Sequence, residues 1–442
     1  MIHLTPSQRD ILVAASTNDG SAASGNDSLL IDISGPLSYS DLKDALARVV
    51  ARHPLLRANI SNDGTVACVQ SSAMIDFATG AAFSGVERLL TEIKSAAAVP
   101  FDFPRGPLVR MRVLPLDRQR TLVMLVLPRL IADEQAFATV VREWVSAYDG
   151  SQWSPDEQTP LNWADAPGWI QPLDEDAAAR YWQDIFQDGV PAAPRLFPRQ
   201  AGASVPSSRH QLFELSEVTV SGIAAAVETL HATPFMILLA LYCAWLHRLG
   251  GCDDLVVAIP GSIRTMDAAE VVCHAAVTLP IRSKLAPGEP FCDLVERIRD
   301  HVLDAMETPP PGIGWLGRLL HVDPSLASSP LNRIAFNLDC ISAQGGFRST
   351  ETRFTDLNAP FVSLDLDDFD GGRILVGNPV PRCDLTFVVD RGEKWKGVLE
   401  TRADIFSATD LDRLAQSLQE FMRLVLDQPG VDLGQFPIKT LP

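Results

Sequence analysis

One seven-residue stretch, from Pro128 to Glu134, constrains the chain most because it joins two segments of different periodicity. Residues 122–127 are a continuous apolar run of strand length, which is typical of a strand covered on both faces. After the stretch, apolar residues recur at helical spacing and predict an amphipathic helix. Strand-to-helix junctions aim side chains into clefts, and this one offers Arg129, Asp133 and Glu134. It contains no histidine, cysteine or serine.

The rest of the chain predicts a mixed α/β fold, in the sense of an α+β two-layer arrangement. Strands are expected near 29–33, 108–113, 255–259, 278–282, 334–338 and 384–389, and helices near 41–50, 86–98, 175–186, 218–230, 234–249 and 411–422. A chain of 442 residues is long for one hydrophobic core, so two domains are expected. The loop-like, proline-rich segment 149–174 places the boundary between residues 1–172 and 173–442.

Composition and charge exclude several classes of function. The formal net charge of −18 argues against binding to nucleic acid or to an anionic membrane surface. No run of about 18 apolar residues suggests a membrane span, and the first residues lack the pattern of a secretion signal. Seven widely spaced cysteines without a Cys-x-x-Cys pair favour reduced thiols over disulfides or a zinc site. We therefore expect a cytoplasmic protein with no metal and no cofactor.

Residues 312–317 fit the Gly-x-Gly-x-x-Gly pattern of dinucleotide-binding turns, and Asp339 lies at a suitable distance behind them. Three prolines precede the pattern where a strand is required. We interpret this segment as a loop rich in glycine and proline.

An ordered series of short motifs resembles the condensation domains of nonribosomal peptide synthetases. The series covers nearly the whole chain, and any one of its members alone is weak. The matching segments are Gly35-Pro36-Leu37, Arg52-His53-Pro54-Leu55-Leu56-Arg57, Phe101-Asp102, Arg105-Gly106-Pro107-Leu108-Val109-Arg110, Tyr181-Trp182, Ala232-Thr233-Pro234-Phe235, Asp253-Asp254-Leu255-Val256-Val257, Arg264, Thr278-Leu279-Pro280-Ile281-Arg282 and Asp384-Leu385-Thr386.

The resemblance implies two chloramphenicol-acetyltransferase-like lobes that meet in a V. It also implies docking surfaces for carrier proteins on opposite faces of the cleft. A peptidyl carrier protein with its phosphopantetheine arm is the partner expected from this resemblance. We expect the chain itself to be a monomer.

The family's active-site motif, His-His-x-x-x-Asp-Gly, aligns with the junction between strand and helix. Pro128 replaces the first histidine, Arg129 the second and Glu134 the glycine, so that only Asp133 remains. In the family the second histidine helps an amine lose a proton or positions it as it meets a thioester. Arginine stays protonated and has no acceptor atom, so Arg129 cannot act as that base. The motif therefore predicts no catalytic residue at these positions.

The roles of the remaining residues follow from the same resemblance. Asp133 is expected to be structural and paired with an arginine, and Arg264 is a second structural residue of the cleft. We expect Arg129 to fill the space of the lost histidine and to pair with Asp133 or Glu134; the alternative is that it binds a substrate carboxylate or a phosphopantetheine phosphate. His274 could approach from the second lobe, but a core or surface histidine with satisfied partners is the favoured interpretation.

Three functions are compatible with this sequence. The first is a non-catalytic domain that recruits a tailoring oxygenase in trans, as the X domain of glycopeptide-antibiotic synthetases recruits cytochrome P-450 enzymes and interface domains of siderophore synthetases recruit non-haem iron hydroxylases. The X-domain motif is His-Arg-x-x-x-Asp-Asp, which Arg129, Asp133 and the acidic Glu134 match while Pro128 departs from it. The second is an active acyltransferase that relies on substrate positioning. The third is an inactive spacer between modules.

Overall fold

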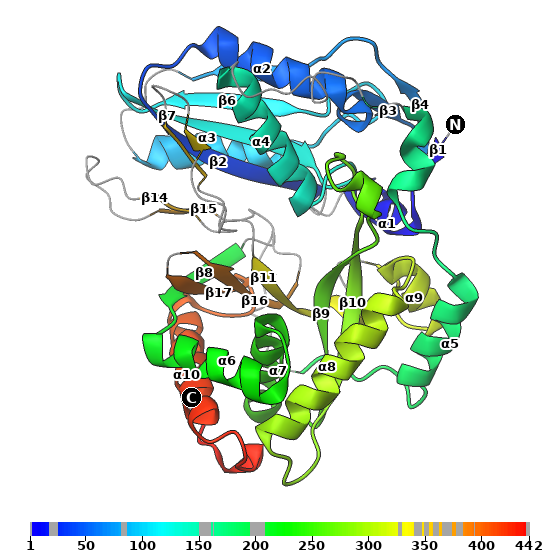
Figure 1. Cartoon of the computed structure of the whole chain (residues 1–442), viewed down its shortest axis with the longest axis vertical. Coiled ribbons are helices and arrows are strands. Elements are labelled where there is room, and N and C mark those ends of the chain that lie inside the picture. The colour runs from blue at the N-terminus through cyan, green and yellow to red at the C-terminus, as the bar shows by residue number, and fades with distance from the viewer. Residues whose placement is uncertain are drawn as a thin grey trace. The chain divides into compact units, whose positions relative to one another are not determined.

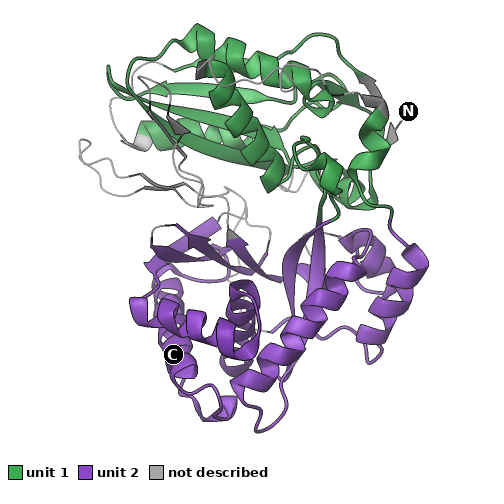
Figure 2. Ribbon diagram, in the orientation of Figure 1, with its two compact units in different colours: residues 1–172, 263–276, 341–379 green, residues 173–262, 277–340, 380–442 purple. Residues whose placement is uncertain are grey.

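The computed structural model of the chain (Figure 1) describes residues 2–16, 25–80, 86–149, 161, 163–194, 208–325, 329–339, 383–392 and 394–438, together with four short strands between 347 and 376. These residues form two compact units, which Figure 2 shows in separate colours. Each unit has mixed helix and sheet content. The predicted α/β class is therefore confirmed.

The first unit is built on a six-stranded sheet with the order β12-β13-β2-β7-β6-β5. Its central strand, β7 (Arg120–Pro128), pairs antiparallel with β2 (Asn26–Ser34) on one side and with β6 (Arg110–Pro115) on the other. Every residue of β7 after Arg120 is buried, as the continuous apolar run predicts. The other strands are β5 (Asp76–Thr79), β12 (Phe347–Arg348) and β13 (Arg353–Asp356). A separate sheet joins β1 (Ile2–His3), β4 (Thr65–Val69) and β3 (Ala58–Ile60).

Two helices of the first unit, α2 (Tyr39–Arg52) and α4 (Glu134–Asp149), pack against each other. The indole nitrogen of Trp144 donates to the carbonyl of Leu42 at 2.9 Å, which fixes their relative position. Ser38 caps α2, because its side chain accepts from the backbone N–H of Asp41. The helices α1 (Pro6–Ser16) and α3 (Val86–Ala98), the 3-10 turn η2 (Pro54–Arg57) and the 3-10 segment η3 (Trp163–Trp169) complete this unit.

The second unit contains another six-stranded sheet, with the order β10-β9-β11-β16-β17-β8. Its strands are β8 (Ser208–Glu214), β9 (Asp254–Ser262), β10 (Ala276–Lys284), β11 (Ile334–Asp339), β16 (Leu385–Arg391) and β17 (Trp395–Arg402). The helices that cover it are α6 (Glu217–Leu230), α7 (Pro234–Gly250), α8 (Phe291–Glu307) and α10 (Ala408–Asp427). The helix α5 (Glu175–Ile185) also belongs to this unit, and Arg282 of β10 donates to the carbonyl of its Ile185 at 2.7 Å. The short two-stranded sheet of β14 (Val362–Leu364) and β15 (Ile374–Val376) belongs to the first unit.

The helix α7, predicted near residues 234–249, has specific capping residues at both ends. Thr233 caps its N-terminus, Pro234 occupies the first turn, and Gly251 ends it in the left-handed conformation at φ 56°. Residues 236–247 are all buried, which makes α7 the central helix of the second unit. No single helix among the described residues is long and apolar enough to cross a membrane; α6 and α7 together reach that length and composition, but they are bent by 108°.

The two units are not continuous in sequence. A boundary falls between residues 172 and 173, where the linker was expected, but residues 263–276 and 341–379 cluster with residues 1–172. We call residues 263–276 the returning segment. The second unit therefore comprises residues 173–262, 277–340 and 380–442 instead of the single block 173–442.

The segment with the dinucleotide-like pattern is a helix, and the expectation of a loop was wrong. Ile313–Leu319 form α9, with the side chains of Ile313 and Leu316 buried. Gly317 explains part of the pattern, because a Cβ at this position would lie 2.7 Å from the backbone of Pro324. The glycine serves close packing of a helix against the chain that follows it.

Candidate functional site: the strand-to-helix junction of the first unit

The degenerate motif lies where the sequence places it, between the end of β7 at Pro128 and the start of α4 at Glu134. Pro128 is the last residue of the central strand and faces Asn26 of β2. Proline is tolerated there because the ladder ends and no further backbone donor is needed. Pro128 and Asp133 are buried, Arg129 is intermediate and Glu134 is exposed.

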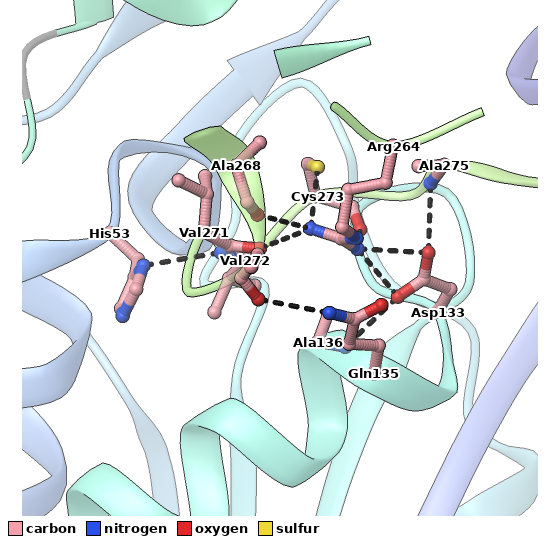
Figure 3. A network of polar contacts seen from close by, with 11 residues as sticks. His53, Asp133, Gln135, Ala136, Arg264, Ala268, Val271, Val272, Cys273 and Ala275 are labelled. Atoms are coloured by element: carbon pink, nitrogen blue, oxygen red, sulfur yellow. Dashed lines mark hydrogen bonds and ion pairs between the residues drawn. The ribbon is translucent and has the colours of Figure 1, made fainter. Parts of the chain in front are cut away.

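Asp133 is held by a buried arginine of the returning segment (Figure 3). One terminal nitrogen of Arg264 donates to both carboxylate oxygens, at 2.8 and 2.9 Å. The side chains are 4% and 8% exposed, so the pair is shielded from water. The same carboxylate accepts from the backbone N–H of Ala136 at 2.9 Å, in the first turn of α4, and from that of Ala275 at 2.9 Å. These contacts join Asp133 to the returning segment and to the first turn of α4.

A second contact ties the returning segment to the first unit through His53. Its Nδ1 accepts from the backbone N–H of Val272 at 3.3 Å, and its Nε2 lies 2.8 Å from Glu143 in α4. Because Nδ1 accepts, Nε2 carries the proton and donates to the carboxylate. Burial lowers the pKa of His53, although the hydrogen bond to Glu143 opposes that shift.

The exposed side of the returning segment adds two more contacts with α4. The amide nitrogen of Gln135 donates to the carbonyl of Ala269 at 3.0 Å. Arg142 pairs with Glu270. Gln135 and Arg142 of α4 therefore contact the returning segment directly, and Glu143 contacts it through His53.

Arg129 pairs with Asp27, a partner that the sequence did not predict, and the expected pairing with Asp133 or Glu134 stays a prediction for Glu134. The Nε of Arg129 lies 3.6 Å from a carboxylate oxygen of Asp27, and its backbone N–H donates to Gly25 at 2.8 Å. The antiparallel register explains the contact: Asp27 faces Leu127, and Arg129 follows two residues after Leu127, so Asp27 and Arg129 are diagonal neighbours on one face. Asp133 is already occupied by Arg264.

His274 also differs from its expected position. It lies in the returning segment, so it belongs to the first unit and not to the second lobe. Its Nδ1 is buried and has no hydrogen-bond partner among the residues that the structure describes. Burial lowers the pKa of His274 to about 4, and the guanidinium of Arg129 acts in the same direction. We expected a histidine whose ring nitrogens both have hydrogen-bond partners. Among the described residues, Nδ1 of His274 has none.

Sequence reasoning missed Asp27 and Glu143 as partners at this junction. Neither lies near the motif in sequence, and their positions follow from strand register and from the packing of α2 on α4. Asp27 follows Asn26, the strand partner of Pro128, so its position beside the motif is recognisable only once the register of β2 and β7 is known.

The chemistry of the junction is restricted by its donors and acceptors. Arg129 offers only donors, and the carboxylate of Asp133 is fully engaged. No group of three or more His, Cys, Asp or Glu side chains able to hold a metal lies within the described part of the chain. Other acceptors at the junction are the carboxylates of Glu134 and Asp27 and the buried imidazole of His274.

The family follows from a match that spans almost the whole chain: the family model "Condensation domain" matches residues 1–438. The chain belongs to the condensation-domain family. Phosphinothricin tripeptide synthetase PhsC of Streptomyces viridochromogenes is 26% identical, over 94% of this chain and 38% of that protein. Tyrocidine synthase 3 of Brevibacillus parabrevis is 24% identical, over 91% of this chain and 6% of that protein. The chain thus spans well under half the length of these two relatives.

Solved structures show the same fold. The X-domain in complex with OxyB from teicoplanin biosynthesis matches with a TM-score of 0.78 and 19% identity, over 100% of this chain and 97% of that chain. The first condensation domain of the calcium-dependent antibiotic synthetase, bound to a substrate analogue, matches with a TM-score of 0.73 and 16% identity, over 99% of each chain. The predicted family and its fold of two chloramphenicol-acetyltransferase-like lobes are confirmed.

Proposed function

We propose that this chain is a condensation-like domain of a nonribosomal peptide synthetase that recruits a tailoring oxygenase to a substrate held on a peptidyl carrier protein. The oxygenase is a cytochrome P-450 or a non-haem iron hydroxylase acting in trans. The five described cysteines are free thiols, which agrees with the cytoplasmic location that we propose for such an assembly.

One observation carries the proposal. The position of the motif's second histidine holds Arg129, whose guanidinium pairs with Asp27. An arginine has no acceptor atom and cannot take a proton from an amine. Asp133, the one motif residue that is retained, binds Arg264 and two backbone amides, which supports a structural role for it.

The structural matches support recruitment without deciding it. The X-domain was solved with OxyB, whereas the condensation domain of similar fold was solved with a substrate analogue. Since both share the fold of this chain, the residues of the motif must distinguish the two functions. Arg129, Asp133 and Glu134 resemble the X-domain motif, and Pro128 keeps the interface-domain subtype as an alternative.

The experiment measures binding and chemistry in parallel. The chain is tested by native mass spectrometry and pull-down against the oxygenases encoded beside its synthetase, and by a condensation assay with native carrier-bound substrates. We expect a stable complex with one oxygenase. Failure to bind any of these oxygenases, together with efficient condensation, would establish the second candidate, an acyltransferase that works without the usual histidine.

A further inference from the structure

Residues 264–273 of the returning segment form a loop that closes around the guanidinium of Arg264, and we call it the arginine loop (Figure 3). Three of its backbone carbonyls accept hydrogen bonds from the terminal nitrogens of the guanidinium, namely those of Ala268, Val271 and Cys273. The sulfur of Cys273 lies 3.1 Å from the same group. Since this guanidinium also binds Asp133, the conformation of the arginine loop determines how the retained motif aspartate is held.

One buried side chain fastens the arginine loop from outside. It belongs to His53, the residue that ends α2. The backbone N–H of Val272 donates to its Nδ1 at 3.3 Å, and its Nε2 donates to Glu143 of α4 at 2.8 Å. The histidine is 0% exposed, so bulk water cannot replace either contact once it is lost. The ring therefore connects the arginine loop to α4.

The contact between His53 and Val272 exists only while the imidazole is neutral. A neutral imidazole has one nitrogen that accepts a hydrogen bond and one that donates, whereas a protonated imidazole has two donors. After protonation, the Nδ1–H of His53 faces the backbone N–H of Val272, and two donors point at each other. The hydrogen bond that fastens the arginine loop is then lost.

Charged groups from three elements surround the ring. Arg52 precedes it at the end of α2, Arg142 and Glu143 lie in α4, and Glu270 of the arginine loop pairs with Arg142. Burial lowers the pKa of His53; the hydrogen bond and charge of Glu143 oppose this shift, and the two arginines reinforce it. The net shift is downward, so the ring is neutral and the arginine loop is fastened at neutral pH.

We propose that His53 is an acid-sensitive clasp for the arginine loop. The neutral ring holds Val272, and a second proton on the ring releases it, so that the arginine loop opens while the rest of the first unit stays folded. Opening loosens the backbone around Arg264 and thereby the support of Asp133 at the junction. This conformational equilibrium does not rest on the proposed function.

The sign of the pH dependence follows from the two states of the loop. The open loop leaves His53 with its ordinary pKa of 6.5, and the closed loop lowers that pKa. The open state therefore binds the proton more tightly, and opening increases as the pH falls below 6.5. One proton can increase opening by at most about tenfold between pH 7.5 and 5.5. Free carboxylates titrate near about pH 4, which lies outside this range.

Hydrogen–deuterium exchange of the full chain measures the opening directly. Exchange of the Val272 amide is followed by mass spectrometry with fragmentation of the peptide that contains it, at pH 7.5 and 5.5. Each rate is divided by the intrinsic exchange rate at that pH. The buried strand β7 of the same unit reports on unfolding of the whole unit. We expect the protection of Val272 to fall about three- to tenfold at pH 5.5 and the protection of β7 to stay constant.

His53→Gln is the decisive variant, because its amide can donate to Glu143 but does not titrate. Val272 is expected to have the same protection at both pH values in this variant. The matched control is His274→Asn, at a second buried histidine of the returning segment, and it should keep the wild-type response. The proposal is overturned by a wild-type change of less than twofold, by an equal response of β7, or by a response that persists in His53→Gln or disappears in His274→Asn.

A second measurement covers the case in which His53→Gln fails to fold. Exchange of the C2 hydrogen of each histidine in heavy water, followed by mass spectrometry over a range of pH, gives the pKa of His53 in the wild-type chain. The proposal expects a pKa below 6.5. A pKa at or above 6.5 overturns it, because a proton on His53 would then not favour the open loop.

Discussion

Arg264 binds both carboxylate oxygens of Asp133 through one guanidinium nitrogen, at 2.8 and 2.9 Å, with both side chains almost fully buried. The two residues are 131 positions apart in sequence. Their contact fixes the returning segment, residues 263–276, on the first unit.

Replacing Arg264 by methionine is expected to destabilise the first unit by about 3–5 kcal/mol, because the carboxylate of Asp133 is left buried without its partner. Urea unfolding measures the loss. The matched control is Arg105→Ala, which removes an ion pair with Asp102 whose side chains are 86% and 45% exposed. Exposed pairs contribute less than about 1 kcal/mol. Equal effects of the two substitutions would contradict a structural role for the buried pair.

Acid is expected to destabilise the chain in the window between pH 6.5 and about 4, the two pKa values of His274 in the unfolded and folded states. Within this window the unfolded chain binds a proton at His274 and the folded chain does not, so stability falls as the pH falls. The loss from His274 is on the order of 3 kcal/mol. His53 contributes in the same direction, because burial lowers its pKa too.

The variant His274→Asn tests this assignment through the slope of unfolding free energy against pH. The slope between pH 6.5 and 4 should become shallower in His274→Asn, where the titrating group is absent. His231→Asn, at an exposed position, should keep the wild-type slope. A wild-type slope in His274→Asn would show that other groups cause the acid sensitivity.

Gly397→Ala is expected to destabilise the second unit by about 1–3 kcal/mol, the usual cost of an overfilled core. A Cβ at Gly397 in β17 would lie 2.5 Å from ring atoms of Phe213, which stacks on Phe387 and has little room to move. Gly430→Ala is the control, since nothing lies within 4 Å of its added carbon. Thermal unfolding compares them, and equal melting temperatures would contradict the tight packing of β17 on β8.

Local patterns predicted most of the secondary structure. The helix α3 begins and ends at the predicted residues, and α7 begins at Pro234 and ends before Gly251 because its capping residues are specific signals. The mixed α/β fold followed from the order of these elements. The helix α9 was missed, because glycines and prolines obscure a helix whose main support is the burial of Ile313 and Leu316.

Contacts between residues that are far apart in the sequence were only partly predictable. The family resemblance supplied the arginine-bound role of Asp133, and the structure identifies Arg264 as its partner. The pairing of Arg129 with Asp27 depends on the register of β2 and β7, which no local pattern reveals. The return of residues 263–276 to the first unit was likewise missed, because it is a property of the chain path and not of any short segment.

Restoring both histidines of the motif, with Pro128→His and Arg129→His, is expected to leave oxygenase binding unchanged. Pro128 is buried at the end of β7, and the side chain of Arg129 is only 29% exposed beside Asp27. A stable protein interface buries about 800 Å² on each partner. Two side chains with so little exposed surface can contribute only a small part of that area. Calorimetry with the oxygenase compares the dissociation constants of the wild type and the double variant.

The double variant with Pro128→His and Arg129→His must be shown to fold before its dissociation constant is compared with that of the wild type. A histidine at residue 128 introduces a buried polar ring, so the melting temperature of the double variant is measured first. With folding intact, a dissociation constant within about twofold of the wild type corresponds to less than about 0.5 kcal/mol and supports recruitment at another surface. A tenfold weaker complex would place recruitment at the junction itself, and Arg129 would then be a partner contact in place of a substituted catalytic residue.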